Sequence, residues 1–332
     1  MEKIRQRIKE ISFIFGALIF SVIVLIICLE VFLRFSIKKD IEFAEKRERL
    51  IKTNGSHLRM PLPPSGKEAG EFRIVALGDS FTWGDGIEDY RKTWPEALQE
   101  RLTDEYAGKK KISVVNMGIC GFTSVNEFEL FARVGKNLNP DMIIIQYLIN
   151  DILPSGPNFM RVGSEWRRSR KCVNLIRNKS MHTFMEKKSY AYYFLNKRFI
   201  ALQMKIWPPS HSWEELYADG SPEWAAFKKA LLGIRRLSEE KGIKTLFVIF
   251  PTFPKGRFDA ANFPEHAIYA KVEDFNRRIG YNVLNLLPLF LNGKRDMSEW
   301  RVNRYDGHPS EEAHSFAAEK ISGYIIKEGL IK

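Results

Sequence analysis

The sequence predicts an α/β fold with a mostly parallel sheet, because short strand-like segments alternate with longer helix-like segments over residues 71–332. The segment from Met142 to Ile149 is dominated by apolar residues, which is typical of a parallel strand buried on both faces. About 260 residues lie within the size range of one domain. The expected strands cover 73–77, 112–116, 141–147, 243–250 and 281–285, and the expected helices cover 93–106, 123–136, 223–241, 264–279 and 310–327.

Near the N-terminus lies a long apolar segment, because the run from Ser12 to Leu29 carries no charge. Eighteen residues at about 1.5 Å each span about 27 Å, close to the roughly 30 Å of a bilayer core. A cleavable signal peptide is the alternative, but the run exceeds the usual length and no small-residue cleavage site follows it. We therefore expect residues 1–35 to form a basic tail and one membrane-spanning helix.

Two further segments flank the expected core. Residues 36–70 are first charged and then rich in Asn, Gly, Ser and Pro, which predicts a linker. Residues 154–222 form an expected insertion that is rich in cations and aromatics and leaves the sheet at the same edge as Asn150. Such an insertion suits a cap that stacks on sugar rings and attracts acidic groups. Plain packing against the body is the alternative, and we favour it for most of these residues.

The formal net charge is +12 and the pI is about 9.5. The basic residues are spread along the chain without a nucleic-acid motif, so we expect no nucleic-acid partner. An anionic membrane surface is the simpler partner for the charges beside the apolar run. Cys120 and Cys172 are the cysteines outside that run, and whether they pair stays open. No cluster has metal-ligand spacing, so we expect no metal and no cofactor.

Ser80 stands where an expected strand ends and an expected helix begins. The apolar run 74–77 leads into Gly78-Asp79-Ser80, which leaves the serine hydroxyl at the carboxyl edge of the sheet, where α/β folds bind ligands. The following helix directs backbone N–H groups toward this position and favours a developing oxyanion. The pattern indicates a nucleophile, with helix capping by Ser80 as the alternative role.

Three distant segments strengthen the catalytic interpretation. Asn116–Gly121 ends one strand in small residues, Asn150 and Asp151 end another, and Asp306 and His308 precede a C-terminal helix. Together they supply backbone amides, a carboxamide, a carboxylate and an imidazole, the set that acyl transfer by a serine needs. The alternative is structural, because Asn and Asp commonly end a strand in a turn.

In this order the segments resemble the conserved blocks of the SGNH (GDSL-type) hydrolases, across roughly residues 72–328. The resemblance implies a flavodoxin-like three-layer α/β/α fold. It also implies that Ser80 is the nucleophile, His308 the base and Asp306 the group that orients this base. The oxyanion donors that it implies are Ser80, Asn150 and a glycine of the second block, where the spacing favours Gly121 over Gly118.

Two positions depart from the family's pattern. Leu148 takes the place of the usual glycine two residues before Asn150. Asp306 stands two residues before His308 instead of three, and Tyr305 occupies the third position. Residues two apart in an extended loop point the same way, so we expect Asp306 to reach the imidazole.

Together these features predict a single-pass, membrane-anchored serine esterase that cleaves O-acyl esters, with acetyl as the expected acyl group, on a small molecule or a glycan. An O-acyltransferase acting on a polysaccharide and a non-catalytic glycan-binding or envelope-assembly protein are the alternatives. Basic residues flank the apolar run on both sides, and their count leans toward a cytoplasmic C-terminus. The resemblance instead implies an extracytoplasmic catalytic domain. The acyl carrier and the oligomeric state stay open.

Overall fold

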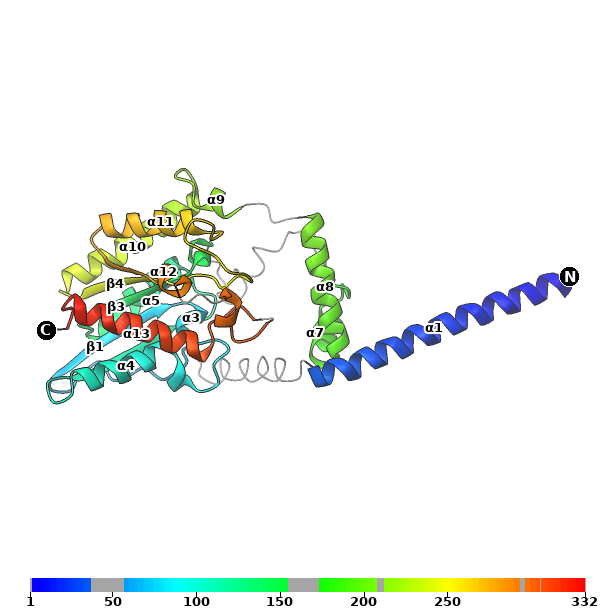
Figure 1. Cartoon of the computed structure of the whole chain (residues 1–332), viewed down its shortest axis with the longest axis horizontal. Helices are drawn as coiled ribbons and strands as arrows, with labels where there is room; N and C mark the ends of the chain where they lie inside the picture. Colours follow the sequence, from blue (N-terminus) through cyan, green and yellow to red (C-terminus); the bar gives the residue numbers. More distant parts are fainter. Residues whose placement is uncertain are drawn as a thin grey trace. The chain divides into compact units, whose positions relative to one another are not determined.

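A computed structural model describes residues 2–36, 57–154, 173–207, 212–292, 296–304 and 306–331. The chain divides into two compact units, and Figure 1 colours them along the sequence. We call residues 47–166 and 211–332 the sheet unit, and residues 1–46 and 167–210 the helical unit. Cys172 lies outside the described residues, so whether it pairs with Cys120 stays open.

The sheet unit contains a five-stranded parallel sheet in the order β2-β1-β3-β4-β5. The chain starts in β1, adds β2 on one side and then adds the other strands on the opposite side, which is a doubly wound order. Leu77 of β1 lies opposite Met117 of β2 and Ile145 of β3, so these strands end near one edge. The strands are β1 Glu71–Gly78, β2 Lys111–Gly118, β3 Met142–Tyr147, β4 Lys244–Ile249 and β5 Asn282–Asn285.

Helices cover both faces of this sheet (Figure 1). The crossover from β1 to β2 runs opposite to the later crossovers, so right-handed connections place α4 on one face and α5, α10 and α11 on the other. The packing of α13 on α4 and of α10 on α5 agrees with these two layers. The longer helices are α4 Trp94–Glu105, α5 Ser124–Arg133, α10 Pro222–Glu240, α11 His266–Arg278 and α13 Glu311–Lys327. The short ones are α3 Ser80–Trp83, α9 Trp213–Leu216, α12 Leu287–Leu291 and the 3-10 turns η1 Tyr90–Lys92, η2 Gly135–Leu138, η3 Ile149–Ile152 and η4 Met297–Trp300.

Local sequence explains where the main helices begin. The Ser221 and Ser310 side chains accept hydrogen bonds from backbone N–H groups in the first turns of α10 and α13. Pro222 occupies the first position of α10, where its missing N–H has no cost. The expected strands and helices are all observed, with ends that agree within a few residues, and the prediction of an α/β fold with a parallel sheet is confirmed.

Part of the expected linker packs on the sheet unit. The Arg59 guanidinium donates hydrogen bonds to the carbonyl oxygens of Gly84 and Ile87, at 2.7 and 2.5 Å. Arg73 donates in the same way to the carbonyl oxygen of Pro64, at 2.9 Å. The packed body of this unit therefore begins before the expected boundary at residue 71.

The helical unit joins the N-terminal helix to part of the expected insertion. It contains α1 Glu2–Ser36, α7 Lys179–Lys188 and α8 Tyr190–Ile206. A window within Lys9–Ser36 has a mean hydropathy of 3.0, so α1 is long and apolar enough to cross a membrane, a test that signal sequences also pass. The described part of the insertion divides between the units: residues 173–207 lie with α1, and residues 212–222 lie with the sheet unit.

Candidate active site

Ser80 is the first residue of α3, two residues after β1 ends at Gly78. A side chain at Gly78 would not fit, because its Cβ would lie 2.2 Å from Thr82 Oγ1 and 2.5 Å from Gln146 Oε1. The Asp79 carboxylate caps α3 by accepting a hydrogen bond from the Phe81 N–H at 2.9 Å. The tight strand-to-helix turn therefore places Ser80 at the sheet edge, as the sequence predicts.

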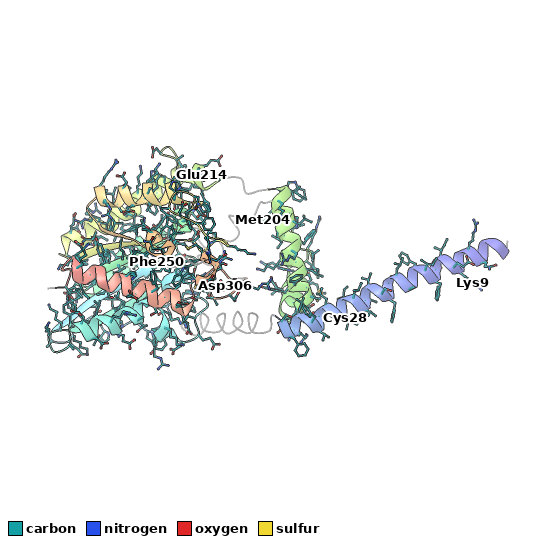
Figure 2. All side chains as sticks on the ribbon, in the orientation of Figure 1. Lys9, Cys28, Met204, Glu214, Phe250 and Asp306 are labelled. Carbon is teal, nitrogen blue, oxygen red and sulfur yellow. The ribbon has the colours of Figure 1, made fainter. Side chains whose placement is uncertain are left out.

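Ser80, His308 and Asp306 form one hydrogen-bonded chain. Ser80 Oγ lies 2.9 Å from His308 Nε2, and His308 Nδ1 lies 2.5 Å from Asp306 Oδ1. The same Asp306 oxygen accepts the backbone N–H of His308 at 3.0 Å, and the Asp306 N–H donates to Asn303 Oδ1 at 2.8 Å. This loop precedes α13, and Figure 2 labels Asp306 on it. The two-residue spacing is therefore long enough for the carboxylate to reach the imidazole.

The surroundings of His308 favour its protonated form. Burial lowers its pKa, but the hydrogen bond to Asp306 and the negative charges of Asp85, Asp306 and Asp79 outweigh burial and raise the pKa above its ordinary value. The Phe81 ring lies against the imidazole, with 5.7 Å between ring centroids. The imidazole is therefore both positioned and made more basic, which suits a group that takes a proton from a serine.

The Asn150 carboxamide is held at the same edge by Asp79. Asn150 lies in η3, directly after β3, and its Nδ2 donates to Asp79 Oδ2 at 3.2 Å. Asp79 is fully buried, and burial raises its pKa. Its carboxylate thus connects the turn that carries Ser80 to the turn that carries Asn150.

The glycines of the second block have different environments. A Cβ at Gly118 would lie 2.3 Å from the Trp83 backbone nitrogen, so this glycine permits close packing of β2 against α3. The Gly118 N–H already donates to Asn116 Oδ1 at 3.0 Å. Gly121 has a φ of 81°, a conformation that favours glycine, and it lies in the loop between β2 and α5. These contacts support Gly121 over Gly118 as the candidate oxyanion donor.

The absence of the usual glycine at Leu148 has a simple structural reason. Leu148 has a φ of −126° and a ψ of 155°, an extended backbone that any residue adopts. Its N–H donates to Asp151 Oδ2 at 2.8 Å, which closes the turn that carries Asn150. The turn therefore forms without glycine at this position.

Sequence reasoning missed Asp85. Its side chain is only 2% exposed, and its Oδ2 lies 3.5 Å from His308 Nε2. The Asp85 N–H donates to the Ser80 carbonyl oxygen at 2.9 Å, in a turn where Gly84 and Gly86 both have positive φ. The sequence does contain a signal for Asp85, because an aspartate between two glycines favours a tight turn. A turn so soon after the candidate nucleophile folds back toward the serine.

Two more buried carboxyl groups lie near Asp79. Burial and then the Asp79 charge raise the pKa of Glu127 well above its ordinary value. Burial and then the Glu127 charge do the same for the pKa of Asp151. Their neutral forms are thus favoured beneath the site. Among the described residues, no group of three or more His, Cys, Asp and Glu side chains is arranged to hold a metal ion.

A doubly wound sheet that brings a serine, a histidine and an aspartate together at its carboxyl edge is an arrangement typical of hydrolases with an α/β/α fold. The model of the GDSL-like lipase/acylhydrolase family matches residues 76–316, and the chain belongs to this family. It is therefore a hydrolase of ester bonds, and the resemblance to SGNH hydrolases is confirmed.

The solved structures that match this chain have low sequence identity to it. TesA is 16% identical with a TM-score of 0.46, covering 78% of this chain and 99% of its own. The acetyl xylan esterase AlAXEase is 14% identical with a TM-score of 0.46, covering 76% and 100%. The psychrotrophic esterase EstA from a Pseudoalteromonas species is 14% identical with a TM-score of 0.44, covering 77% and 97%. No curated protein matches the sequence.

Proposed function

We propose that the chain is a membrane-anchored serine esterase that cleaves O-acyl esters, with acetyl as the acyl group and a cell-envelope or extracellular glycan as the carrier. The observation that carries the catalytic part is the chain of contacts from Ser80 Oγ to His308 Nε2 and from His308 Nδ1 to Asp306. Such a chain of hydrogen bonds can remove a proton from the serine while the serine attacks a carbonyl carbon.

In the proposed mechanism, His308 Nε2 accepts the proton of Ser80 Oγ, and Oγ forms a bond to the ester carbonyl carbon. The N–H groups of Ser80 and Gly121 and the Asn150 carboxamide hold the oxyanion. The leaving alcohol then takes the proton from His308, and the acyl group stays on Ser80. Water, deprotonated by His308, releases the acid and restores the serine. Asp306 keeps Nδ1 protonated throughout, so that Nε2 faces the serine.

We further propose that α1 is the anchor and that residues 36–332 lie outside the cytoplasm. The apolar length of α1 supports the anchor. A reporter fused to the C-terminus, with one version active only in the cytoplasm and one active only outside it, measures the topology. Activity of the outside reporter alone is expected, and activity of the cytoplasmic reporter alone would contradict this part of the proposal.

The catalytic proposal is tested with the full chain in detergent, p-nitrophenyl acetate and acetylated polysaccharides, each with and without a glycan acceptor. We expect ester cleavage by the unsubstituted chain, its loss in Ser80→Ala, and its retention in Ser315→Ala, which changes an exposed serine. Transfer of the acyl group to the glycan acceptor instead of to water would show that the protein is an acyltransferase. A full-length, folded chain that releases nothing from any ester would contradict both.

A further inference from the structure

Helix α8 turns polar side chains inward. Asn196 is 2% exposed, and its Oδ1 accepts the Leu175 N–H at 2.9 Å. The Gln203 side chain accepts the Val173 N–H and donates to the Val173 carbonyl oxygen, both at 2.9 Å. The two amide side chains therefore satisfy the backbone of the segment that precedes α7, inside the helical unit.

A neighbouring side of α8, about a quarter turn from this polar side, exposes apolar residues. Leu202 is 57% exposed and Ile206 is 60% exposed, and Leu195 also lies open. Spacings of seven and four residues place these three side chains on one side of the helix. A helix of a water-soluble protein has the reverse pattern, because exposing apolar surface to water is unfavourable. The medium around this stripe is therefore expected to be apolar.

The start of α8 is tied to the end of α1. The Glu30 carboxylate of α1 accepts hydrogen bonds from the Ser189 hydroxyl at 2.8 Å and from the Ala191 N–H at 2.9 Å. Arg34 pairs with Glu30 at 2.9 Å, and its guanidinium lies 5.1 Å from the centre of the Tyr190 ring. These charge-assisted contacts fix the first turn of α8 on the last turns of α1.

Glu30 also marks the level at which the apolar run of α1 ends, since residues 12–29 carry no charge. In a membrane-spanning α1, this level is the boundary between acyl chains and headgroups. Helix α8 starts there, close to Cys28, and Figure 2 labels Cys28 on α1 and Met204 on α8.

We propose that α7 and α8 form an interfacial helical pair whose exposed apolar stripe, Leu195, Leu202 and Ile206, enters the surface of the lipid bilayer that α1 spans. This inference rests on the proposed anchoring by α1. Lipid is the occupant because the Glu30 contacts place the start of α8 at the level where the apolar run of α1 ends. Backbone groups near lipid must also be satisfied within the protein, as the Val173 N–H and carbonyl oxygen and the Leu175 N–H are. Arg198 and Lys205, exposed beside the stripe, suit anionic headgroups.

The test uses the full chain in vesicles of phosphatidylcholine and phosphatidylglycerol. A fluorescent label is attached at Leu202→Cys or at Leu195→Cys, in a background with Cys28→Ala and Cys172→Ala that keeps the buried Cys120. Phe20→Cys, in the middle of α1, reports on the anchor itself, and Asp274→Cys, exposed on α11, reports on a position in water. Quenching is measured with spin-labelled lipid and, separately, with iodide, and the label on the background alone is subtracted.

Spin-labelled lipid is expected to quench the labels at Leu202 and Leu195 several times more strongly than the label at Asp274, with iodide showing the reverse order. Lipid quenching at Phe20 without quenching at Leu202 and Leu195 would overturn the inference while the anchor stands. Protection of both α8 labels from lipid and iodide alike would also overturn it, because protein would then cover the stripe. No lipid quenching at Phe20 either would overturn both the anchor and the inference.

Discussion

The sheet unit and helix α8 of the helical unit place apolar side chains in opposite ways. Every residue of β3 is buried, and the strands around it fill one continuous core. In α8, the buried positions include Asn196 and Gln203, whereas Leu202 and Ile206 lie exposed. An apolar pattern in a sequence thus defines the face that avoids water, and the surrounding medium decides whether this face points inward or outward.

The two units also differ in their proposed roles, catalysis in the sheet unit and membrane attachment in the helical unit. The proposed catalytic groups all lie in the sheet unit, at the edge where its strands end. Among the described residues, the polar contacts of Glu30 join elements of the helical unit. Substitutions at the sheet edge should therefore change turnover and leave the contact of α8 with α1 intact, and substitutions in the helical unit should do the reverse.

Among substitutions that leave Ser80 and His308 in place, Asp306→Asn is expected to have the largest effect. An amide at this position no longer holds the imidazole tautomer that leaves Nε2 free, and kcat should fall by up to about 10⁴-fold. Steady-state turnover of p-nitrophenyl acetate by the full chain measures it, with exchange protection of α8 as the control that should stay unchanged. A loss below about tenfold would reduce the site to Ser80 and His308.

Asn150→Ala is expected to have the next largest effect. Removing one oxyanion donor should lower kcat by roughly 10²- to 10³-fold with little change in KM. Because Asn150 also contacts Asp79, thermal unfolding is measured alongside, and Asn150→Asp restores the shape without the N–H donor. Full activity of Asn150→Ala would remove this residue from the oxyanion site.

Asp85→Asn should move the pH profile rather than abolish turnover. The raised pKa of His308 owes part of its shift to the negative charge of Asp85, and the proposed base acts in its neutral form, so activity appears as pH rises through this pKa. Removing the charge lowers the His308 pKa and moves the acidic limb of kcat/KM to lower pH. Asp89→Asn, at a half-buried carboxylate that pairs with Arg91 in the same loop region, is the control that should leave the limb in place. An unchanged limb in Asp85→Asn would show that Asp85 does not act on His308.

The smallest effect is expected from Glu30→Ala, and it should fall on the helical unit alone. Losing hydrogen bonds to a charged group is worth about 1.5–3 kcal/mol, so amides at the start of α8 should exchange with solvent about 10- to 100-fold faster. Hydrogen exchange of the full chain in vesicles measures this, and Glu10→Ala on the same helix is the matched control. Slowed ester turnover in Glu30→Ala would mean that the two units do not divide the roles in this way.

Much of the sheet unit was predictable from sequence, because its strands are short apolar runs and its helices begin at recognisable caps. The position of Ser80 followed from the run 74–77 and the small residues after it. The turn at Leu148 shows why the family's glycine is dispensable, since the backbone there is extended, and this depends on dihedral angles that a sequence does not state.

Two features depend on contacts between distant residues, and these contacts are not stated by the sequence itself. Asp85 reaches His308 only because the folded turn returns toward the loop before α13, and the two residues are far apart in sequence. In the sequence, Glu30 is simply the charge that ends an apolar run. Its role in holding α8 arises from its contact with Ala191, which lies 161 positions later. The insertion was expected to cap the site or pack on the body, whereas its described residues 173–207 cluster with α1.

The assignment of Ser80 as the nucleophile can be tested by covalent capture. The full chain is incubated with a fluorophosphonate, which reacts with activated serines, and the modified residue is identified by mass spectrometry of peptides. We expect one adduct on Ser80, formed in parallel with loss of ester turnover and absent from both Ser80→Ala and His308→Ala. An adduct on another residue, together with turnover that persists in Ser80→Ala, would contradict it.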